Sequence, residues 1–431
     1  MEIQEKTVNL LYTSWSDENT PITNGYDLDY TEICDNPHFF DFSNFIQNYL
    51  NNNSQFEYDK KIKINKVKVE DVNNHDKYFY VICNANLHLD EIVKTKFPVH
   101  DKVIELLKSG KNVNVVFCRE HEPECKFGVE RLYDSIKKLG LDESKFHIIN
   151  NNVNTKSQIN NLSSNINSHK LNFIEYSSTE VLTNIQNKFT YEREYLFMCR
   201  NKKPKFHRLC ALLYLYDSSV LQNTNWSFIP NDEMNRNSYI HYLKIFDKEE
   251  LNRKIKSADF INSIFKYDVY ENPNWFDGNG DFQHQNDFKP IFQIPEEVKS
   301  FRNAYINIVT ESNFENIENI VHPTEKSFRP FYHNQIPIFL STPHHVKYLK
   351  EKYNFDMFDD LIDNSYDDII DDQLRFFKVM QEIEKLNQKG KSFIYRYFRK
   401  NKDRFENNQK ILLEKFKENR ILDLNYFWNI L

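Results

Sequence analysis

One short segment of the chain, Pro323–Pro330, gathers an acid and two cations at a predicted strand-to-helix junction. Lys326 and Arg329 are three residues apart, so a helix presents both side chains on one face. Glu325 directly precedes Lys326. Cations in the first turn of a helix favour bound anions, because the helix dipole is positive at that end. The segment therefore predicts a phosphate-binding site.

A second segment, Phe197–Arg208, has an apolar run, then a polar loop, then the start of a helix. Arg208 falls in the first turn of that predicted helix, where a guanidinium again favours a bound anion. Asn201 follows the apolar run and is a candidate phosphate contact. We interpret the other cations of this segment as exposed loop charges; they are Arg200, Lys202, Lys203 and Lys205.

Carboxylates follow two further apolar runs and are candidates for general-base and hydroxyl-binding roles. Glu311 comes directly after one of these runs. Glu120, His121 and Glu122 come after the other, and each is a candidate base. A solvated loop with helix-capping acids has the same composition, so the sequence leaves both interpretations of this loop open.

Patterns for metal binding are weak. His344 and His345 are adjacent but have no third ligand nearby in the sequence. The run Asp277–Asp281 lacks the Gly and Glu that an EF-hand needs at its sixth and twelfth positions. Asp27–Asp29 has the acidic spacing of a metal-dependent transferase but no strands before it. We therefore expect a site that requires no metal.

Strands and helices alternate from about residue 76, which is typical of a parallel α/β domain. The expected strands are Asp76–Ala85, Asn112–Cys118, Lys145–Asn150 and Lys170–Tyr176, and the expected helices are Val99–Lys108 and Phe127–Leu139. Residues 1–60 are expected to be irregular, with one helix near Phe42–Leu50.

The alternation restarts near Glu194. The expected strands are Tyr195–Cys199, Asn225–Ile229, Ala304–Thr310 and Ile336–Leu340, and the expected helices are Phe206–Leu215, Lys248–Phe265, Glu325–Asn334 and His344–Lys352. Pro330 predicts that its helix begins near Ser327 or is kinked. Two amphipathic helices, Asp372–Leu386 and Asp403–Asn419, are expected to follow. Both phosphate-binding segments follow strands, where open α/β sheets bind their ligands.

The composition excludes several other classes of protein. The 431 residues carry 56 Lys and Arg against 63 Asp and Glu, and the net charge of −7 argues against a globally basic nucleic-acid binder. The seven glycines form neither a Walker loop nor a dinucleotide fingerprint, so side chains must hold any phosphate. Six cysteines without a C-x-x-C pair fit a reducing cytoplasm. We expect neither a membrane span nor a signal peptide.

The same segments resemble the donor site of the α-1,3-fucosyltransferase-like glycosyltransferases. Glu311–Asn313 is similar to the family's Glu-Asn-rich strand end, and Thr324–Arg329 to its Thr-Glu-Lys helix start. Gln335–Phe339 resembles its Val-Pro-Val strand, and Phe197–Arg208 its strand, Ser-Asn loop and helix-start Arg. Two positions depart from the family: Ser312 replaces the usual Asn, and Ser341 stands where a Gly often follows.

The resemblance implies an α/β fold of the GT-B type, with two Rossmann-like domains facing a cleft. It implies an acceptor-side domain over residues 1–190, a donor domain over 191–371 and a helical extension over 372–431. It also implies a nucleotide-sugar donor, a GDP- or UDP-sugar, and inversion at the anomeric carbon without a metal. The base would come from the N-terminal domain, where Glu120 and Glu122 are the candidates.

The resemblance further implies a role for each residue of the donor site. Lys326 and Arg208 would neutralise the diphosphate, and Asn201 would contact a phosphate. Glu325 would hold ribose or sugar hydroxyls, and Glu311 would bind or orient the sugar. Arg329, on the face of Lys326, would also belong to the donor site.

The acceptor stays open between a glycan, another hydroxyl-bearing molecule and a modified base in DNA. The run Lys389–Arg404 interleaves cations with aromatic residues, which is typical of a nucleic-acid contact. A helix that packs its aromatic face and solvates its basic face has the same composition, and we favour that interpretation. A non-catalytic nucleotide- or glycan-binding protein is the alternative from a different class.

Overall fold

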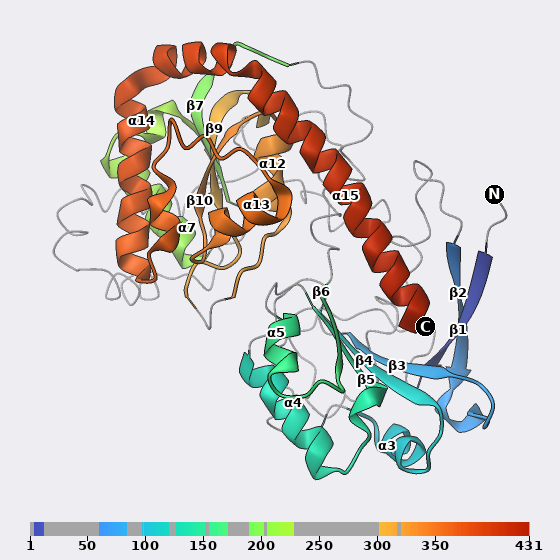
Figure 1. Cartoon of the computed structure of the whole chain (residues 1–431). Helices are drawn as coiled ribbons and strands as arrows, with labels where there is room; N and C mark the ends of the chain where they lie inside the picture. Colours follow the sequence, from blue (N-terminus) through green and yellow to red (C-terminus); the bar gives the residue numbers. More distant parts are fainter. Residues whose placement is uncertain are drawn as a thin grey trace, which may run out of the picture. The chain divides into compact units, whose positions relative to one another are not determined.

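The computed structural model describes residues 4–12, 60–83, 97, 99–119, 126–150, 155–170, 189–201, 205–227, 301–316 and 320–430. These residues form two compact units (Figure 1). The first unit comprises Met1–Ile174 together with Lys417–Leu431, and the second comprises Glu175–Phe416. Each unit contains one parallel sheet, and the C-terminal segment is helical. The prediction of an α/β protein with two parallel-sheet units and C-terminal helices is therefore confirmed.

The first unit is built on a six-stranded sheet in the order β2-β1-β3-β4-β5-β6, in which all neighbouring strands run parallel. Its strands are β1 (Gln4–Tyr12), β2 (Lys60–Lys68), β3 (Tyr78–Cys83), β4 (Val113–Arg119), β5 (Phe146–Asn150) and β6 (Asn167–Lys170). Tyr80, Val115 and Ile148 lie on one face of the sheet and are at most 1% exposed. The helices α3 (Asp101–Lys108), α4 (Lys126–Lys138) and α5 (Thr155–Asn160) contribute Val103, Leu132 and Ile159 to the same core.

The sequence-based expectation for the beginning of this unit was wrong. Residues 4–12 form β1, inside the sheet, although residues 1–60 were expected to be irregular. β2 was missed as well, because five lysines in nine residues hide the alternation of a sheet-edge strand. β6 ends at Lys170, where the expected strand was to begin. The helices expected near Phe42–Leu50 and Lys248–Phe265 lie outside the described residues.

The last turns of the final helix, α15 (Lys402–Ile430), belong to the first unit. Lys6 Nζ donates to the carbonyl of Trp428 at 2.6 Å, and Lys77 Nζ donates to the carbonyl of Ile430. The last carbonyls of a helix have no partners within the helix and carry the negative end of its dipole. Lysines from β1 and from the residue before β3 therefore stabilise the end of α15.

The second unit is built on a four-stranded parallel sheet in the order β10-β9-β7-β8. The strands are β7 (Tyr195–Arg200), β8 (Thr224–Ser227), β9 (Ala304–Thr310) and β10 (Ile336–Leu340). Every residue of β9 and β10 is buried, as near-continuous apolar runs in a parallel sheet predict. The expected ranges of these two strands are confirmed.

Among the described residues, the second unit also contains helices α7 (Phe206–Asp217), α12 (Glu325–Tyr332), α13 (His345–Tyr353) and α14 (Asp372–Lys400), together with the first part of α15. α14 packs against β7, β9 and β10. It continues past Leu386, where the expected helix ended, but its backbone breaks at Gly390, whose φ is 77°. A left-handed φ suits glycine because it has no Cβ. Within the part of the chain that the structure describes, none of the helices combines the length and the apolar character that a membrane span requires.

Candidate functional site

The second unit has a topological switch point between β7 and β9. From β7 the chain moves outward to β8, and β9 and β10 then lie on the opposite side of β7. Open α/β sheets bind ligands outside the carboxyl ends of their strands at such a point. The carboxyl ends of β7 and β9 are residues Arg200 and Thr310. A ligand site in this unit is therefore expected beside these two residues.

A small pocket lies at this switch point. It is lined by Arg200, Phe301, Asn307, Ile308, Val309, Thr310, Lys326 and Arg329. Three of the eight residues are cations and none is an acid, although the whole chain is net negative. Phe301 contacts two of the cations, with its ring centroid 6.0 Å from Arg200 Cζ and 5.6 Å from Arg329 Cζ. The pocket therefore concentrates positive charge beside an aromatic wall.

Arg200 is the cation of this pocket that the sequence analysis misassigned. It was expected to be an exposed loop charge, but it is the last residue of β7 and is half-buried. Its backbone pairs in register with Ser227 of β8. The expected strand ended one residue earlier, at Cys199. Arg200 was therefore assigned to the loop because the end of the strand was misplaced by one residue. Lys202 and Lys203 lie outside the described residues.

The first turn of α12 supplies the other two cations. The helix begins at Glu325, not near Ser327, and Thr324 caps it by accepting from the backbone N–H of Lys326 at 3.3 Å. Pro330 lies inside the helix without ending it. The start at Glu325 confirms the beginning of the expected helix Glu325–Asn334, and the alternative start near Ser327 is wrong.

Glu325 lies between the two cations of α12. Its Oε1 is 2.8 Å from Lys326 Nζ and 3.5 Å from an Arg329 guanidinium nitrogen. Partial burial raises the pKa of Glu325, but the two cations and the hydrogen bond from Lys326 outweigh it, so the pKa falls to about 2. The side chain is 24% exposed. Glu325 is therefore ionised at any physiological pH and reaches solvent next to the pocket.

Glu311 is a buried carboxylate whose oxygens accept hydrogen bonds from the surrounding residues. It is 1% exposed, and its oxygens accept from the N–H of Ser312 at 3.0 Å and from Thr324 Oγ1 at 2.6 Å. The N–H of Thr324 and the hydroxyl of Ser327 also donate to it. Burial raises its pKa, but the charge of Lys326 and the hydroxyls of Ser327 and Thr324 outweigh burial and lower the pKa. Glu311 thereby links the end of β9 to the start of α12.

Ser327 extends this link to a third element. Its hydroxyl donates to Glu311 and lies 2.7 Å from Nε2 of His345, the first residue of α13. Since the Ser327 proton points to the carboxylate, His345 Nε2–H donates to Ser327 Oγ. Burial lowers the pKa of His345 to about 4, against an opposing effect of Glu311. The chain His345, Ser327, Glu311 therefore holds a neutral imidazole and an ionised carboxylate.

Arg208 and His207, in the first turn of α7, bind the carboxyl end of β9. One Arg208 guanidinium nitrogen donates to the carbonyls of Thr310 and Glu311, both at 3.2 Å. His207 Nε2 lies 2.9 Å from the Glu311 carbonyl and donates to it. Burial lowers the pKa of Arg208, while Glu311 and Glu325 raise it. Arg208 thus adds buried positive charge to the region of the pocket and positions one of its walls.

Asn201 and Lys205 also bind backbone or side chains around this end of the sheet. Asn201 is 2% exposed, and its Oδ1 accepts from Thr310 Oγ1 while its Nδ2 donates to Cys199 Sγ at 3.4 Å. Lys205 was expected to be an exposed loop charge. Its Nζ instead donates to the Ser312 carbonyl at 2.8 Å. Asn201 therefore ties the end of β7 to the last residue of β9, and Lys205 ties the start of α7 to the loop after β9.

Arg375 of α14 connects two loops of the second unit, and this role was not predicted from the sequence. It is 2% exposed and donates to the carbonyls of Ser341 and Phe314, at 3.0 and 2.5 Å. It also binds Asp372 at 2.6 Å, and that carboxylate accepts from the N–H of Asn316 at 3.0 Å. The loops after β9 and β10 are therefore held by α14. An i, i+3 acid–base pair at the start of a helix was the only signal in the sequence.

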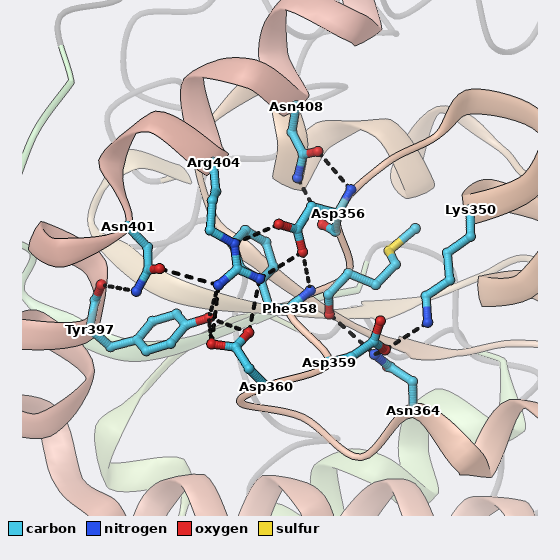
Figure 2. Close-up of polar contacts among 11 residues, drawn as sticks. Lys350, Asp356, Phe358, Asp359, Asp360, Asn364, Tyr397, Asn401, Arg404 and Asn408 are labelled. Atoms are coloured by element: carbon cyan, nitrogen blue, oxygen red, sulfur yellow. Dashed lines mark hydrogen bonds and ion pairs between the residues drawn. The ribbon is translucent and has the colours of Figure 1, made fainter.

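Figure 2 shows a second polar cluster of this unit, centred on Arg404 of α15. Arg404 binds Asp356 through Nε and Asp360 through a terminal nitrogen, at 2.5 and 2.8 Å. Tyr397 donates to Asp360 at 2.9 Å, and Asn408 donates to the carbonyl of Asp356 at 2.8 Å. This cluster fixes the loop after α13 against α14 and α15, and Arg404 is fully occupied in it.

Two candidate bases cannot be placed, because Glu120 and Glu122 lie outside the described residues, as does His121. Among the residues that are described, no group of three or more His, Cys, Asp or Glu side chains is arranged to hold a metal ion. His344 lies 3.5 Å from Asp368, whereas His345 is buried in the Glu311 network.

Comparison with known proteins gives distant similarities only. No family model matches the chain, and no curated protein matches it. The chain is similar to a UDP-forming α,α-trehalose-phosphate synthase from Burkholderia vietnamiensis, with a TM-score of 0.39 and 9% identity over 83% of this chain and 76% of that chain. It is also similar to the DNA-modifying enzyme β-glucosyltransferase, with a TM-score of 0.36 and 10% identity over 96% of both chains. The resemblance to the fucosyltransferase-like family stays a prediction.

Proposed function

We propose that the chain is a glycosyltransferase whose second unit binds the diphosphate of a nucleotide-sugar donor. The observation that carries the proposal is the pocket at the β7–β9 switch point, lined by Arg200, Lys326 and Arg329. A diphosphate leaving group gains negative charge when the bond to the sugar breaks, and fixed cations stabilise that charge. The first turn of α12 adds the positive end of a helix dipole.

The residues divide into two roles under this proposal. Arg200, Lys326 and Arg329 contact the diphosphate, and Arg208 adds a buried charge behind them. Glu325 is partly exposed and ionised, which suits it to accept hydrogen bonds from ribose or sugar hydroxyls. Glu311 is buried with four donors on its oxygens, and we assign it a positioning role in place of direct contact with the sugar.

The reaction we propose is an inverting transfer in a GT-B arrangement. An acceptor hydroxyl attacks the anomeric carbon and gives its proton to a base, while the bond to the phosphate oxygen breaks and nucleoside diphosphate leaves. Glu120 and Glu122 are the candidate bases. The side chains of the site supply the positive charge without a metal. A GDP- or UDP-sugar is the proposed donor, and the acceptor is a glycan or another molecule with a hydroxyl.

A thermal-shift screen tests the proposal. GDP-, UDP- and ADP-sugars are added separately, and we expect one donor to raise the unfolding midpoint by roughly 5–10 °C at about 100 times its Kd. Lys326→Ala and Arg329→Ala should each weaken that binding by about tenfold or more, because a charged hydrogen bond to phosphate is lost. Lys347→Ala, an exposed lysine of α13, is the matched control.

Stabilisation by no nucleotide sugar would contradict the proposal. Release of nucleoside diphosphate in the presence of acceptor then separates a transferase from a binding protein. Stabilisation without any release of product, across glycan and DNA acceptors, would instead support the non-catalytic alternative.

A further inference from the structure

The second unit carries a run of cations that the donor site does not use. Residues 389–402 contain six Lys and Arg and no Asp or Glu, in a chain whose net charge is −7. The structure sorts these cations into two groups. Lys402 pairs with Glu406 at 3.1 Å, and Arg404 just beyond is occupied by Asp356 and Asp360 (Figure 2). The remaining cations are Lys389, Lys391, Arg396, Arg399 and Lys400.

These five residues form what we call the basic stripe. All five are exposed, and no described residue forms a salt bridge with any of them. Lys391 Nζ donates to the backbone carbonyl of Glu194 at 2.8 Å, which leaves its charge without a carboxylate partner. Within the helical turns that follow Gly390, Ile394 and Phe398 are buried, so Arg396, Arg399 and Lys400 lie on the opposite, solvent-facing side. Five clustered cations in an acidic protein indicate an anionic partner.

Aromatic rings lie beside the stripe and reach solvent. Phe393 and Tyr191 are each 37% exposed. Lys389 Nζ lies 5.2 Å from the centroid of Phe393, and Arg399 Cζ lies 5.7 Å from the centroids of Tyr191 and Tyr395. Cations that follow a phosphate backbone, together with exposed rings on which bases stack, are the two components of a single-strand binding surface. An amphipathic membrane helix would need a continuous apolar face in contact with lipid, and that face is buried here.

The stripe lies at the other end of the sheet from Arg200 and Thr310 of the donor pocket. Arg193 packs its guanidinium 4.5 Å from the Phe398 ring and donates to the carbonyl of Ala304, the first residue of β9. It also donates to the carbonyls of His333 and Asn334, just before β10. These contacts place Phe398, and with it the stripe, beside the amino ends of β9 and β10. Arg200 and Thr310 of the pocket are instead the carboxyl ends of β7 and β9.

We propose that the basic stripe, with Phe393 and Tyr191, binds single-stranded nucleic acid. This inference goes beyond the proposed transfer reaction and does not require it. The phosphates contact Arg396, Arg399 and Lys400, and bases stack on the two exposed rings. The observation that distinguishes these cations from Lys402 and Arg404 is the lack of any carboxylate partner among the described residues.

Fluorescence anisotropy of a labelled 20-nucleotide single-stranded DNA, titrated with the full chain at several salt concentrations, tests the inference. We expect the triple variant Arg396→Ala, Arg399→Ala, Lys400→Ala to bind at least tenfold more weakly and to lower the slope of log K against log salt by about 2, since each released phosphate contact contributes about 0.7. Phe393→Ala should weaken binding without changing that slope. Lys402→Ala is the matched control, because its charge is already paired.

Nucleotide-sugar binding by the triple variant should equal that of the wild type, which separates this inference from the proposed function. The inference is overturned if wild type and triple variant bind the DNA equally. It is also overturned if duplex DNA, poly-glutamate or vesicles containing anionic lipid bind more tightly than the single strand.

Discussion

At the scale of single residues, the Glu325 carboxylate and a bound diphosphate compete for the same two cations. Glu325 Oε1 contacts both Lys326 and Arg329, so one negative charge partly neutralises two positive ones. A diphosphate carries more charge than one carboxylate and can bind in front of both cations. The spacing of Lys326 and Arg329 predicted that they line one site, and the pocket contains both. The sequence could not show that Glu311 is enclosed, because its donors come from residues 312, 324 and 327, and their convergence depends on the fold.

At this scale we predict that acidification destabilises the protein through His345. Its folded pKa of about 4 lies below the ordinary value of 6.5, because burial disfavours the charged ring. Between these values the unfolded chain binds the proton, so the stability is complete above pH 6.5 and falls as the pH drops towards 4. At pH 5 the loss is about 2 kcal/mol from this residue. Thermal midpoints at pH 7 and pH 5 should differ less in His345→Gln than in the wild type.

His344→Asn serves as the control for this experiment. The His344 side chain is 41% exposed, and Asn tolerates its left-handed backbone, whose φ is 64°. This variant should keep the full pH dependence. An unchanged difference between the two midpoints in His345→Gln would contradict the buried neutral state.

At the scale of elements, what could be predicted depended on how local the signal was. β9 and β10 are near-continuous apolar runs and were predicted to the residue. β1 and β2 are polar or lysine-rich, and they depend on pairing across more than 50 residues. The expected helix from Asp372 ended at Leu386, whereas α14 continues to Lys400 across the backbone break at Gly390. The sequence of the last turns of α15 did not predict that they pack against β6. There His169 Nε2 lies 2.8 Å from Asp423, which is fully buried, and the His169 ring stacks 3.9 Å from Tyr426.

Removing Asp423 should therefore loosen the first unit. We expect Asp423→Ala to lower the free energy of unfolding of this unit by about 3 kcal/mol, because it leaves a mostly buried histidine without its partner. Hydrogen exchange measured on peptides covering β5 and β6 should speed up, while peptides covering β9 and β10 stay protected. Glu414→Ala, on the exposed part of the same helix, should change little, since its pair with Lys410 is on the surface. Equal exchange in β6 of Asp423→Ala and wild type would contradict this role for α15.

At the scale of the whole molecule, two parallel α/β units are combined with a helical segment that contributes to both. The alternation of strands and helices predicted the class of fold. The strand order could not be read from the sequence, because it depends on which side of β7 the chain takes when it forms β9. That choice creates the switch point, and with it the pocket. The domain boundaries at residues 190 and 371 and the candidate bases Glu120 and Glu122 stay predictions.

The central claim is that the cations at the β7–β9 switch point bind the diphosphate of the donor. The most direct test is isothermal titration calorimetry of a nucleoside diphosphate and its matching nucleoside, with wild type and the double variant Lys326→Ala, Arg329→Ala. We predict that the diphosphate binds the wild type far more tightly than the nucleoside does, and that the double variant reduces this advantage by about 100-fold. An advantage of the same size in the double variant, with an unchanged unfolding midpoint, would contradict the claim.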